Sequence, residues 1–331
     1  MRVPILRFPI LRLPRPRLAP PRPFRLLALA LASLALSASC TGTGAEGEAE
    51  GRQGKLRVLT TTGIVGDLAR QVAGEHASVE SLMSTGVDPH LYKASESDVR
   101  RLAGADLILY NGLHLEGKMS DVLVKMARSR PVAAVSDSLP REELREPPEF
   151  LGQYDPHVWF DIRMWSDCLD PVVRELSALD PEHAADFQAN AEAYRQQLLD
   201  LDRWVEERVQ EIPEDQRVLV TAHDAFGYFG RRYGVEVVGL QGISTLSEAG
   251  LRDVERVVSL VVDRGVPAIF VESSVPRRSI EAVQAAVRDR GHDVEVGGTL
   301  YSDSMGPEGS PEGTYVGMVR TNVETLVGAL R

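Results

Sequence analysis

Residues 180–212 read DPEHAADFQANAEAYRQQLLDLDRWVEERVQEI, and Pro213 follows them. Apolar side chains recur in this stretch at steps of three and four, which places them along one face of a helix. They are Ala184, Phe187, Ala191, Tyr194, Leu198, Leu201 and Val205. We expect Asp180 to cap the free amides of the first turn, with Pro181 at the first helical position. Pro213 lacks the N–H that a continuing helix needs, so the pattern predicts one long helix that ends before it.

A helix of about thirty residues is roughly 45 Å long, which exceeds the width of a small domain. One interpretation is a coiled coil between two copies of the chain, but the charges that would flank its seam are not clearly complementary. We favour the alternative, in which one rigid helix joins two lobes of the same molecule.

The segments on either side of this helix alternate between strand and helix patterns. The predicted strands cover residues 56–61, 79–83, 106–110, 132–135, 218–221, 235–238, 268–272 and 294–296. The predicted helices cover residues 65–73, 95–103, 118–127, 164–179, 225–233, 250–264, 277–290 and 315–330. Such alternation predicts an α/β fold with parallel sheets. We therefore expect two small four-stranded lobes, residues 55–179 and 213–331, with a site in the cleft between them.

The first 40 residues differ in composition from the rest of the chain. Residues 1–25 contain seven arginines and no acidic residue, residues 26–36 are an apolar run, and small residues precede Cys40. This order predicts a secretory signal peptide, and the position of the cysteine resembles a bacterial lipoprotein signal in which Cys40 becomes the acylated first residue. Residues 41–54 contain no large apolar side chain, which predicts a flexible tether to the membrane.

Charge excludes one class of partner. The whole chain carries a net charge of −11, and removal of the seven arginines of residues 1–40 makes it −18. We expect no nucleic-acid binding, because phosphate recognition depends on Lys and Arg. The chain has two cysteines, and with Cys40 acylated only Cys168 remains, so no disulfide framework is expected.

Three of the seven histidines stand out by their position near predicted strand ends. His90 and His157 each follow an Asp-Pro pair, and His223 lies at the end of the strand predicted over residues 218–221. In the two Asp-Pro-His motifs, we expect the acid to accept the second ring N–H and so orient the imidazole for a metal ion. His114 also follows a strand and is a weaker candidate. His76, His183 and His292 lie near helix ends among charged residues, and we interpret them as solvated.

Four segments resemble motifs of the zinc/manganese solute-binding proteins of bacterial ABC importers, the TroA-like metal-binding lipoproteins. They are GVDPHLY (86–92), YDPHVWF (154–160), TAHDAFGYF (221–229) and LYSDSMG (300–306), and with the long helix they extend over residues 55–330. The resemblance implies two α/β lobes joined by one rigid helix, with the metal held between them. The ligands it implies are His90, His157, His223 and Asp303.

The function that this resemblance implies is capture of one Zn²⁺ or Mn²⁺ per chain, outside the cytoplasm, for delivery to the membrane permease of an ABC importer. We expect a monomer at the outer face of the cytoplasmic membrane or in the periplasm. Three imidazoles and one carboxylate suit zinc, whereas a second oxygen from Asp303 would also suit manganese. Some relatives carry a glutamate at the place of His223, and these are chiefly manganese proteins. Zinc-specific relatives often carry a His-rich loop where residues 136–154 contain no histidine.

Two other functions are weighed against metal transport. A zinc hydrolase needs an open coordination position and an acid/base partner, and the chain contains no HExxH motif. Glu272 ends a predicted strand and resembles a general base, but we expect it to orient a ligand or cap a helix. A surface adhesin of the same family is the other alternative, although no dedicated adhesive segment is present. We expect Trp159, Phe160, Phe226, Tyr228 and Phe229 to pack around the site.

Overall fold

The computed structural model describes residues 54–150 and 152–331. The predicted signal peptide with Cys40 lies outside these residues, as does the predicted tether up to residue 53. The described residues belong to one compact unit. Among them, no helix is both long enough and apolar enough to span a bilayer.

The first lobe is built on a four-stranded parallel sheet with the strand order β2-β1-β3-β4. Its strands are β1 (Leu56–Thr60), β2 (Ala77–Ser81), β3 (Leu107–Tyr110) and β4 (Val132–Ala134). Val58 of β1 pairs with Val79 on one side and with Leu107 on the other, so β1 is a central strand. Because all four strands run in one direction, their carboxyl ends meet at one edge of the sheet, where ligands bind in open α/β folds.

Five α-helices complete this lobe. They are α1 (Gly63–Ala73), α2 (Glu96–Gly104), α3 (Ser120–Met126), α4 (Ile162–Asp167) and α5 (Leu169–Leu179). The single helix predicted over residues 164–179 is wrong, because the chain forms α4 and α5 with a break at Cys168. Pro171 explains the break, since it has no N–H and its ring would clash with the carbonyl of Asp167 in a continuous helix.

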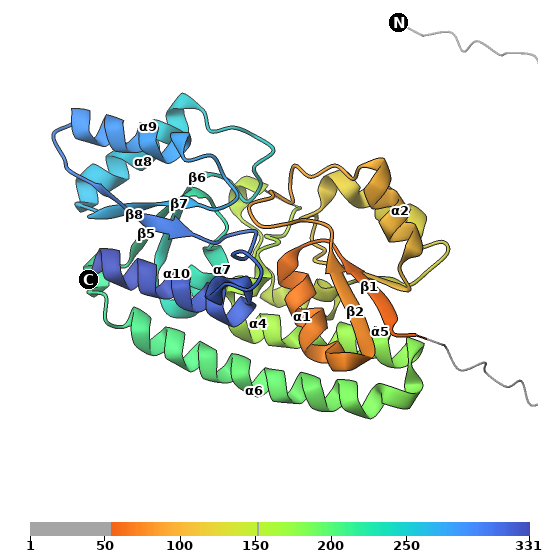
Figure 1. Cartoon of the computed structure of the whole chain (residues 1–331). Coiled ribbons are helices and arrows are strands. Elements are labelled where there is room, and N and C mark those ends of the chain that lie inside the picture. The colour runs from red at the N-terminus through yellow and green to blue at the C-terminus, as the bar shows by residue number, and fades with distance from the viewer. Residues whose placement is uncertain (1–53, 151) are drawn as a thin grey trace, which may run out of the picture. The chain divides into compact units, whose positions relative to one another are not determined.

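The long connecting helix α6 (Ala184–Val209) runs along one side of both lobes (Figure 1). A 3₁₀ turn, Pro181–His183, precedes it. Six of the seven predicted stripe residues are buried, and Ala184 is half-buried. The predicted cap is wrong, because the Asp180 carboxylate lies 2.8 Å from the ring Nδ1 of His183 and accepts no backbone amide of the first turn.

The second lobe also has four parallel-paired strands, but they form two separate pairs. The strands are β5 (Val218–His223), β6 (Glu236–Gln241), β7 (Ala268–Glu272) and β8 (Glu295–Leu300). β5 pairs with β6 and β7 with β8, while β5 lies beside β7 without a hydrogen-bonded ladder between them. The helices of this lobe are α7 (Gly227–Tyr233), α8 (Leu251–Arg264), α9 (Arg278–Asp289) and α10 (Tyr315–Leu330).

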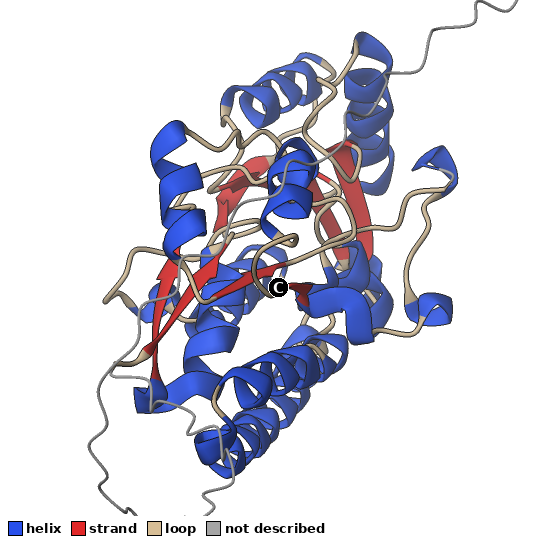
Figure 2. Ribbon diagram, turned by 90° about the vertical axis from the view of Figure 1, so that its right-hand side faces the viewer, coloured by secondary structure: helices blue, strands red, loops and turns tan. Residues whose placement is uncertain are grey.

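One hydrophobic core extends through both lobes and the connecting helix. Leu56 of β1, Leu198 of α6 and Leu330 of α10 belong to the same cluster of buried side chains. A second cluster lies between β5–β8 and the helices α8 and α9, and a third between the first sheet and the helices α2 and α3. Helices therefore flank the strands of each lobe (Figure 2). The predicted two-lobed α/β fold with a long joining helix is confirmed.

Candidate metal centre

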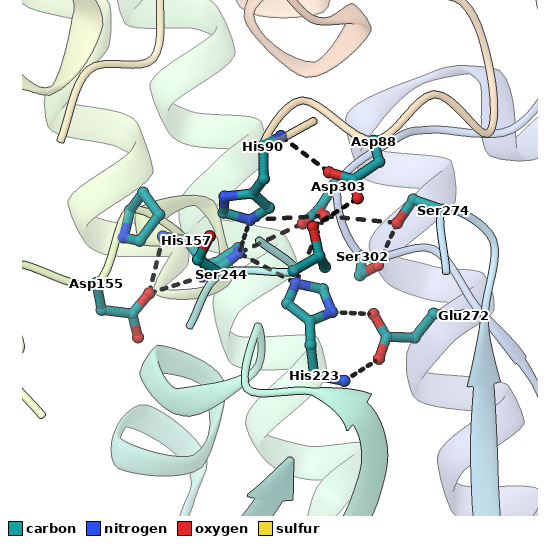
Figure 3. Close-up of polar contacts among 12 residues, drawn as sticks. Asp88, His90, Asp155, His157, His223, Ser244, Glu272, Ser274, Ser302 and Asp303 are labelled. Carbon is teal, nitrogen blue, oxygen red and sulfur yellow. Dashed lines mark hydrogen bonds and ion pairs between the residues drawn. The ribbon is translucent and has the colours of Figure 1, made fainter. Parts of the chain in front are cut away.

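The four candidate ligands lie together where the two lobes face each other (Figure 3). His90 lies in the loop between β2 and α2, and His157 lies in the segment between β4 and α4. His223 is the last residue of β5, and Asp303 follows the end of β8. All four are buried, with at most 3% of each residue exposed. Each lobe thus contributes two of the four side chains.

The spacing of the ligand atoms matches the demands of a single ion. The Nε2 atom of His157 lies 3.4 Å from Nε2 of His90 and 3.3 Å from Nε2 of His223. All four ligand atoms lie within 4.8 Å of one another. With bonds near 2.1 Å, the ligands of a tetrahedral zinc site are roughly 3.4 Å apart. The cluster therefore requires little rearrangement to hold a divalent ion.

Asp155 holds the ring of His157. Its Oδ1 accepts hydrogen bonds from the His157 backbone N–H at 3.0 Å and from the ring Nδ1–H at 2.7 Å. Its Oδ2 is paired with the guanidinium of Arg145, which comes from the histidine-free loop. With Nδ1 occupied, the lone pair of Nε2 faces the other ligands. This is the arrangement expected from the second Asp-Pro-His motif.

Glu272, the last residue of β7, plays the corresponding role for His223. Its Oε1 accepts the His223 backbone N–H at 2.8 Å, and its Oε2 lies 2.6 Å from the ring Nδ1. Glu272 is 3% exposed and no catalytic partner adjoins it among the described residues, so it orients a ligand as expected.

His90 is held differently, and here the sequence prediction is wrong. Asp88 Oδ1 accepts the backbone N–H of His90 at 2.8 Å and does not contact the ring. The other oxygen of Asp88 accepts the hydroxyl of Thr245 from the second lobe at 2.6 Å. The two Asp-Pro-His motifs therefore position their histidines by different contacts.

Both oxygens of Asp303 face the imidazoles. Oδ1 lies 3.4 Å from Nε2 of His157, and Oδ2 lies 3.4 Å from Nε2 of His223. Oδ1 is buried and, within the part of the chain that the structure describes, accepts no hydrogen bond of normal geometry. A buried carboxylate oxygen without a donor is costly unless a cation satisfies it, which fits a metal ion.

The charges of the cluster shift the histidine pKa values in opposite directions. Burial lowers the pKa of His90 to about 3, despite the charge of Asp303. Burial also acts to lower the pKa of His157, but the hydrogen bond to Asp155 and the negative charge of Asp303 close to the ring outweigh it and raise the pKa to about 9. For His223, the charges of Glu272 and Asp303 likewise overcome burial and raise the pKa. In the absence of a metal, these shifts favour the protonated form of His157 and His223 and the neutral form of His90.

The other histidines do not join this cluster. His114 is exposed, with a backbone φ of 65°, and lies apart from the four candidate ligands. His76 and His183 stack on each other with ring centroids 3.9 Å apart and pair with Asp186 and Asp180, so they are partnered rather than simply solvated. The ring of His292 lies 3.3 Å from the carbonyl of Val266.

An aromatic side chain of the shared core packs on one of the candidate ligands. Trp159 packs edge-on against the ring of His157, with centroids 5.2 Å apart, and donates its indole N–H to the carbonyl of Ser302 at 3.1 Å. The five aromatic residues expected to pack around the site are all buried, namely Trp159, Phe160, Phe226, Tyr228 and Phe229. Of these five, Trp159 is the one whose ring is seen to pack on a ligand within the described residues.

Comparison with known proteins agrees with this geometry. Residues 58–329 match the family described as the zinc-uptake complex component A, periplasmic. The chain belongs to this family. It is a family of metal-uptake binding proteins rather than enzymes, and the resemblance to TroA-like lipoproteins is confirmed.

Two relatives are equally similar in sequence. The manganese-binding lipoprotein MntA of Bacillus subtilis is 49% identical over 278 residues, covering 84% of this chain and 90% of the relative. The zinc-binding protein TroA of Treponema pallidum is 49% identical over 277 residues, covering 84% of this chain and 89% of the relative. The solved structure of the Treponema pallidum protein matches with a TM-score of 0.82, over 84% of this chain and 99% of that one.

Proposed function

We propose that this protein captures one Zn²⁺ or Mn²⁺ outside the cytoplasm and delivers it to the permease of an ABC importer. The observation that carries the proposal is the buried cluster of three imidazoles and one carboxylate, whose ligand atoms lie within 4.8 Å of one another. Membership of a metal-uptake family supports it. We assign the four ligand positions to His90, His157, His223 and Asp303.

The two lobes would each supply half of the site. We propose a first lobe of residues 55–179 and a second lobe of residues 213–331, joined by residues 180–212. Because His90 and His157 come from one lobe and His223 and Asp303 from the other, the ion would connect the two. A bound ion would thus stabilise the arrangement of the lobes as well as the folded chain.

For the identity of the ion, we favour zinc over manganese. Three nitrogen ligands support this choice, because affinity at nitrogen sites rises from manganese towards zinc. The relatives do not separate the two, since one named for manganese and one named for zinc share the same identity with this chain. Both oxygens of Asp303 face the site, which would allow a five-coordinate ion of either metal.

We also propose that the protein has no catalytic activity of its own. Four protein ligands would leave little room for the water molecule and substrate that a zinc hydrolase activates. Glu272 is the carboxylate that most resembles a general base, but its two oxygens lie against the backbone N–H and the ring of His223.

We propose that the chain is exported and anchored to the membrane through an acylated Cys40, with residues 41–54 as a tether. It would act as a monomer that docks on the permease. Mass spectrometry of the protein extracted from membranes tests the anchor. A mature chain that begins beyond Cys40, or that keeps an unmodified Cys40, would show secretion without a lipid.

Metal analysis of the purified mature protein tests the function itself. We expect one divalent ion per chain after reloading, and its loss in a variant that combines His157→Ala with His223→Ala. An ion content near zero in the wild-type protein, or unchanged binding in the double variant, would contradict the proposal. Rescue of a deletion strain by manganese alone would overturn the choice of zinc and leave the four ligands standing.

A further inference from the structure

The two Asp-Pro-His motifs have the same sequence but different contacts. Asp155 binds the ring of His157, and Glu272 lies against the ring of His223. Within the described residues, no carboxylate contacts Nδ1 of His90, and Asp88 reaches only its backbone N–H. Two histidines are thus oriented through their rings, whereas His90 depends on the position of its loop.

The loop that carries His90 is attached to the opposite lobe. The Thr85 hydroxyl donates to the carbonyl of Gly306 at 3.0 Å, and the Gly86 N–H donates to the Ser304 hydroxyl at 3.0 Å. Gly86 has a φ of 76°, and a Cβ there would lie 3.4 Å from the carbonyl oxygen of Ser273. In sequence this loop is part of the first lobe, but hydrogen bonds attach it to the second lobe.

A hydrogen bond between Thr245 and Asp88 connects the second lobe to the candidate ligand His90. The Thr245 hydroxyl donates to Asp88 Oδ2 at 2.6 Å, and the same carboxylate accepts the His90 N–H through Oδ1. Thr245 is 8% exposed, so water does not readily replace its hydroxyl. Short hydrogen bonds from hydroxyl to carboxylate are among the stronger ones in proteins.

We propose that Thr245 is a positioning residue of the metal site, which retains the ion by holding the His90 backbone through Asp88. This inference rests on the proposed function and adds to it a residue that does not touch the metal. Without the Thr245 hydroxyl, Asp88 still accepts the His90 N–H, but its carboxylate is no longer held by the second lobe. The rings of His157 and His223 do not depend on such a contact, because Asp155 and Glu272 each bind the ring of a histidine in their own lobe.

The test measures how fast the protein loses zinc to an excess of a coloured chelator. In Thr245→Val, a methyl group replaces the hydroxyl at similar volume, and we expect release to be about tenfold faster. Thr245→Ser keeps the hydroxyl and should release zinc at the wild-type rate. Thr299→Val, at an exposed position of β8, is the matched control and should also leave the rate unchanged.

A double-mutant cycle separates positioning from general loosening of the loop. If Thr245 acts through Asp88, then Thr245→Val in an Asp88→Asn background should add little to the effect of Asp88→Asn alone. Full additivity, or wild-type release by Thr245→Val, would overturn the proposal while the wild-type protein still holds one zinc ion. A wild-type protein that binds no zinc would overturn the proposed function and this inference together.

Discussion

At the residue scale, the candidate site shows which contacts a sequence can reveal. The four candidate ligands lie in motifs that resemble those of a known family, and it is this resemblance that indicates them as one set. The ring contact of Asp155 could also be predicted, because it spans only two residues. No sequence pattern indicates that Arg145 pairs with Asp155 or that Thr245 binds Asp88, since these contacts depend on how distant segments pack.

Replacement of Glu272 by Gln should weaken metal binding about 10- to 100-fold. The amide keeps the shape of the side chain but removes the negative charge that makes Nε2 of His223 a better donor. Competition titration with a chelator of known affinity measures the change. Glu281→Gln, on the exposed face of α9, is the control and should bind as the wild type does. Equal affinity in both variants would exclude a role for the Glu272 charge.

Metal binding should release protons and strengthen as the pH rises. In the metal-free protein, the pKa of His157 is raised to about 9 and that of His223 is also raised, which favours the protonated form of both imidazoles. A histidine binds a metal ion through its neutral ring, so each of these histidines gives up its proton on binding. His90 releases none, because its pKa of about 3 leaves it neutral.

Calorimetry at pH 7.5 in buffers of different ionisation enthalpy counts these protons. We expect up to two protons per ion and an affinity that falls as the pH is lowered, by up to tenfold per unit for each proton. Binding without any proton release would show that the site is already deprotonated before the metal arrives.

At the scale of elements, the periodic patterns predict where helices and strands lie. They do not predict how neighbouring elements join or pair. β7 and α10 have their predicted bounds, and a capping box of Ser95 and Asp98 begins α2 close to the predicted start. The break at Cys168 was missed because the apolar pattern continues across it, although Pro171 marks the position. The separation of the second sheet into two pairs has no counterpart in the sequence pattern, because alternation of strands and helices does not reveal which strands pair.

Asp202 of α6 connects three helices, and its removal should destabilise the fold. Its carboxylate accepts the Arg163 Nε–H of α4 at 2.9 Å, the Tyr233 hydroxyl of α7 at 2.9 Å, and two N–H groups of Arg232. We expect Asp202→Asn to lower the free energy of unfolding by about 2 kcal/mol, since hydrogen bonds to a buried charge are lost. Urea denaturation measures it.

The control for this variant is Asp200→Asn on the exposed side of the same helix, where the carboxylate pairs with Arg203 and, within residues 54–150 and 152–331, with no other cation. Exposed pairs of this kind contribute little, so we expect a change below about 0.5 kcal/mol. If both substitutions change the free energy of unfolding equally, the contacts of Asp202 between the lobes do not stabilise the fold more than an exposed ion pair does.

At the scale of the whole molecule, the shared core and the continuous helix predict small movements. α6 has 26 residues and buries one face along both lobes, so no flexible crossover is available to absorb a large rotation. We expect the radius of gyration from X-ray scattering to be nearly the same for the metal-free and metal-loaded protein, with changes confined to loops. A large decrease on loading would contradict a rigid connector.

The common core also has a consequence for how the protein is made. Almost the whole described chain separates β1 from α10, yet Leu56 and Leu330 belong to one buried cluster. The apolar stripe of α6 packs on α1, α4 and α5, which precede it in the chain, and also on α10, so its cover is complete only when the last helix emerges. We expect a chain cut short before Tyr315 to leave part of that stripe open and to become a substrate for proteases, rather than a binder of reduced affinity.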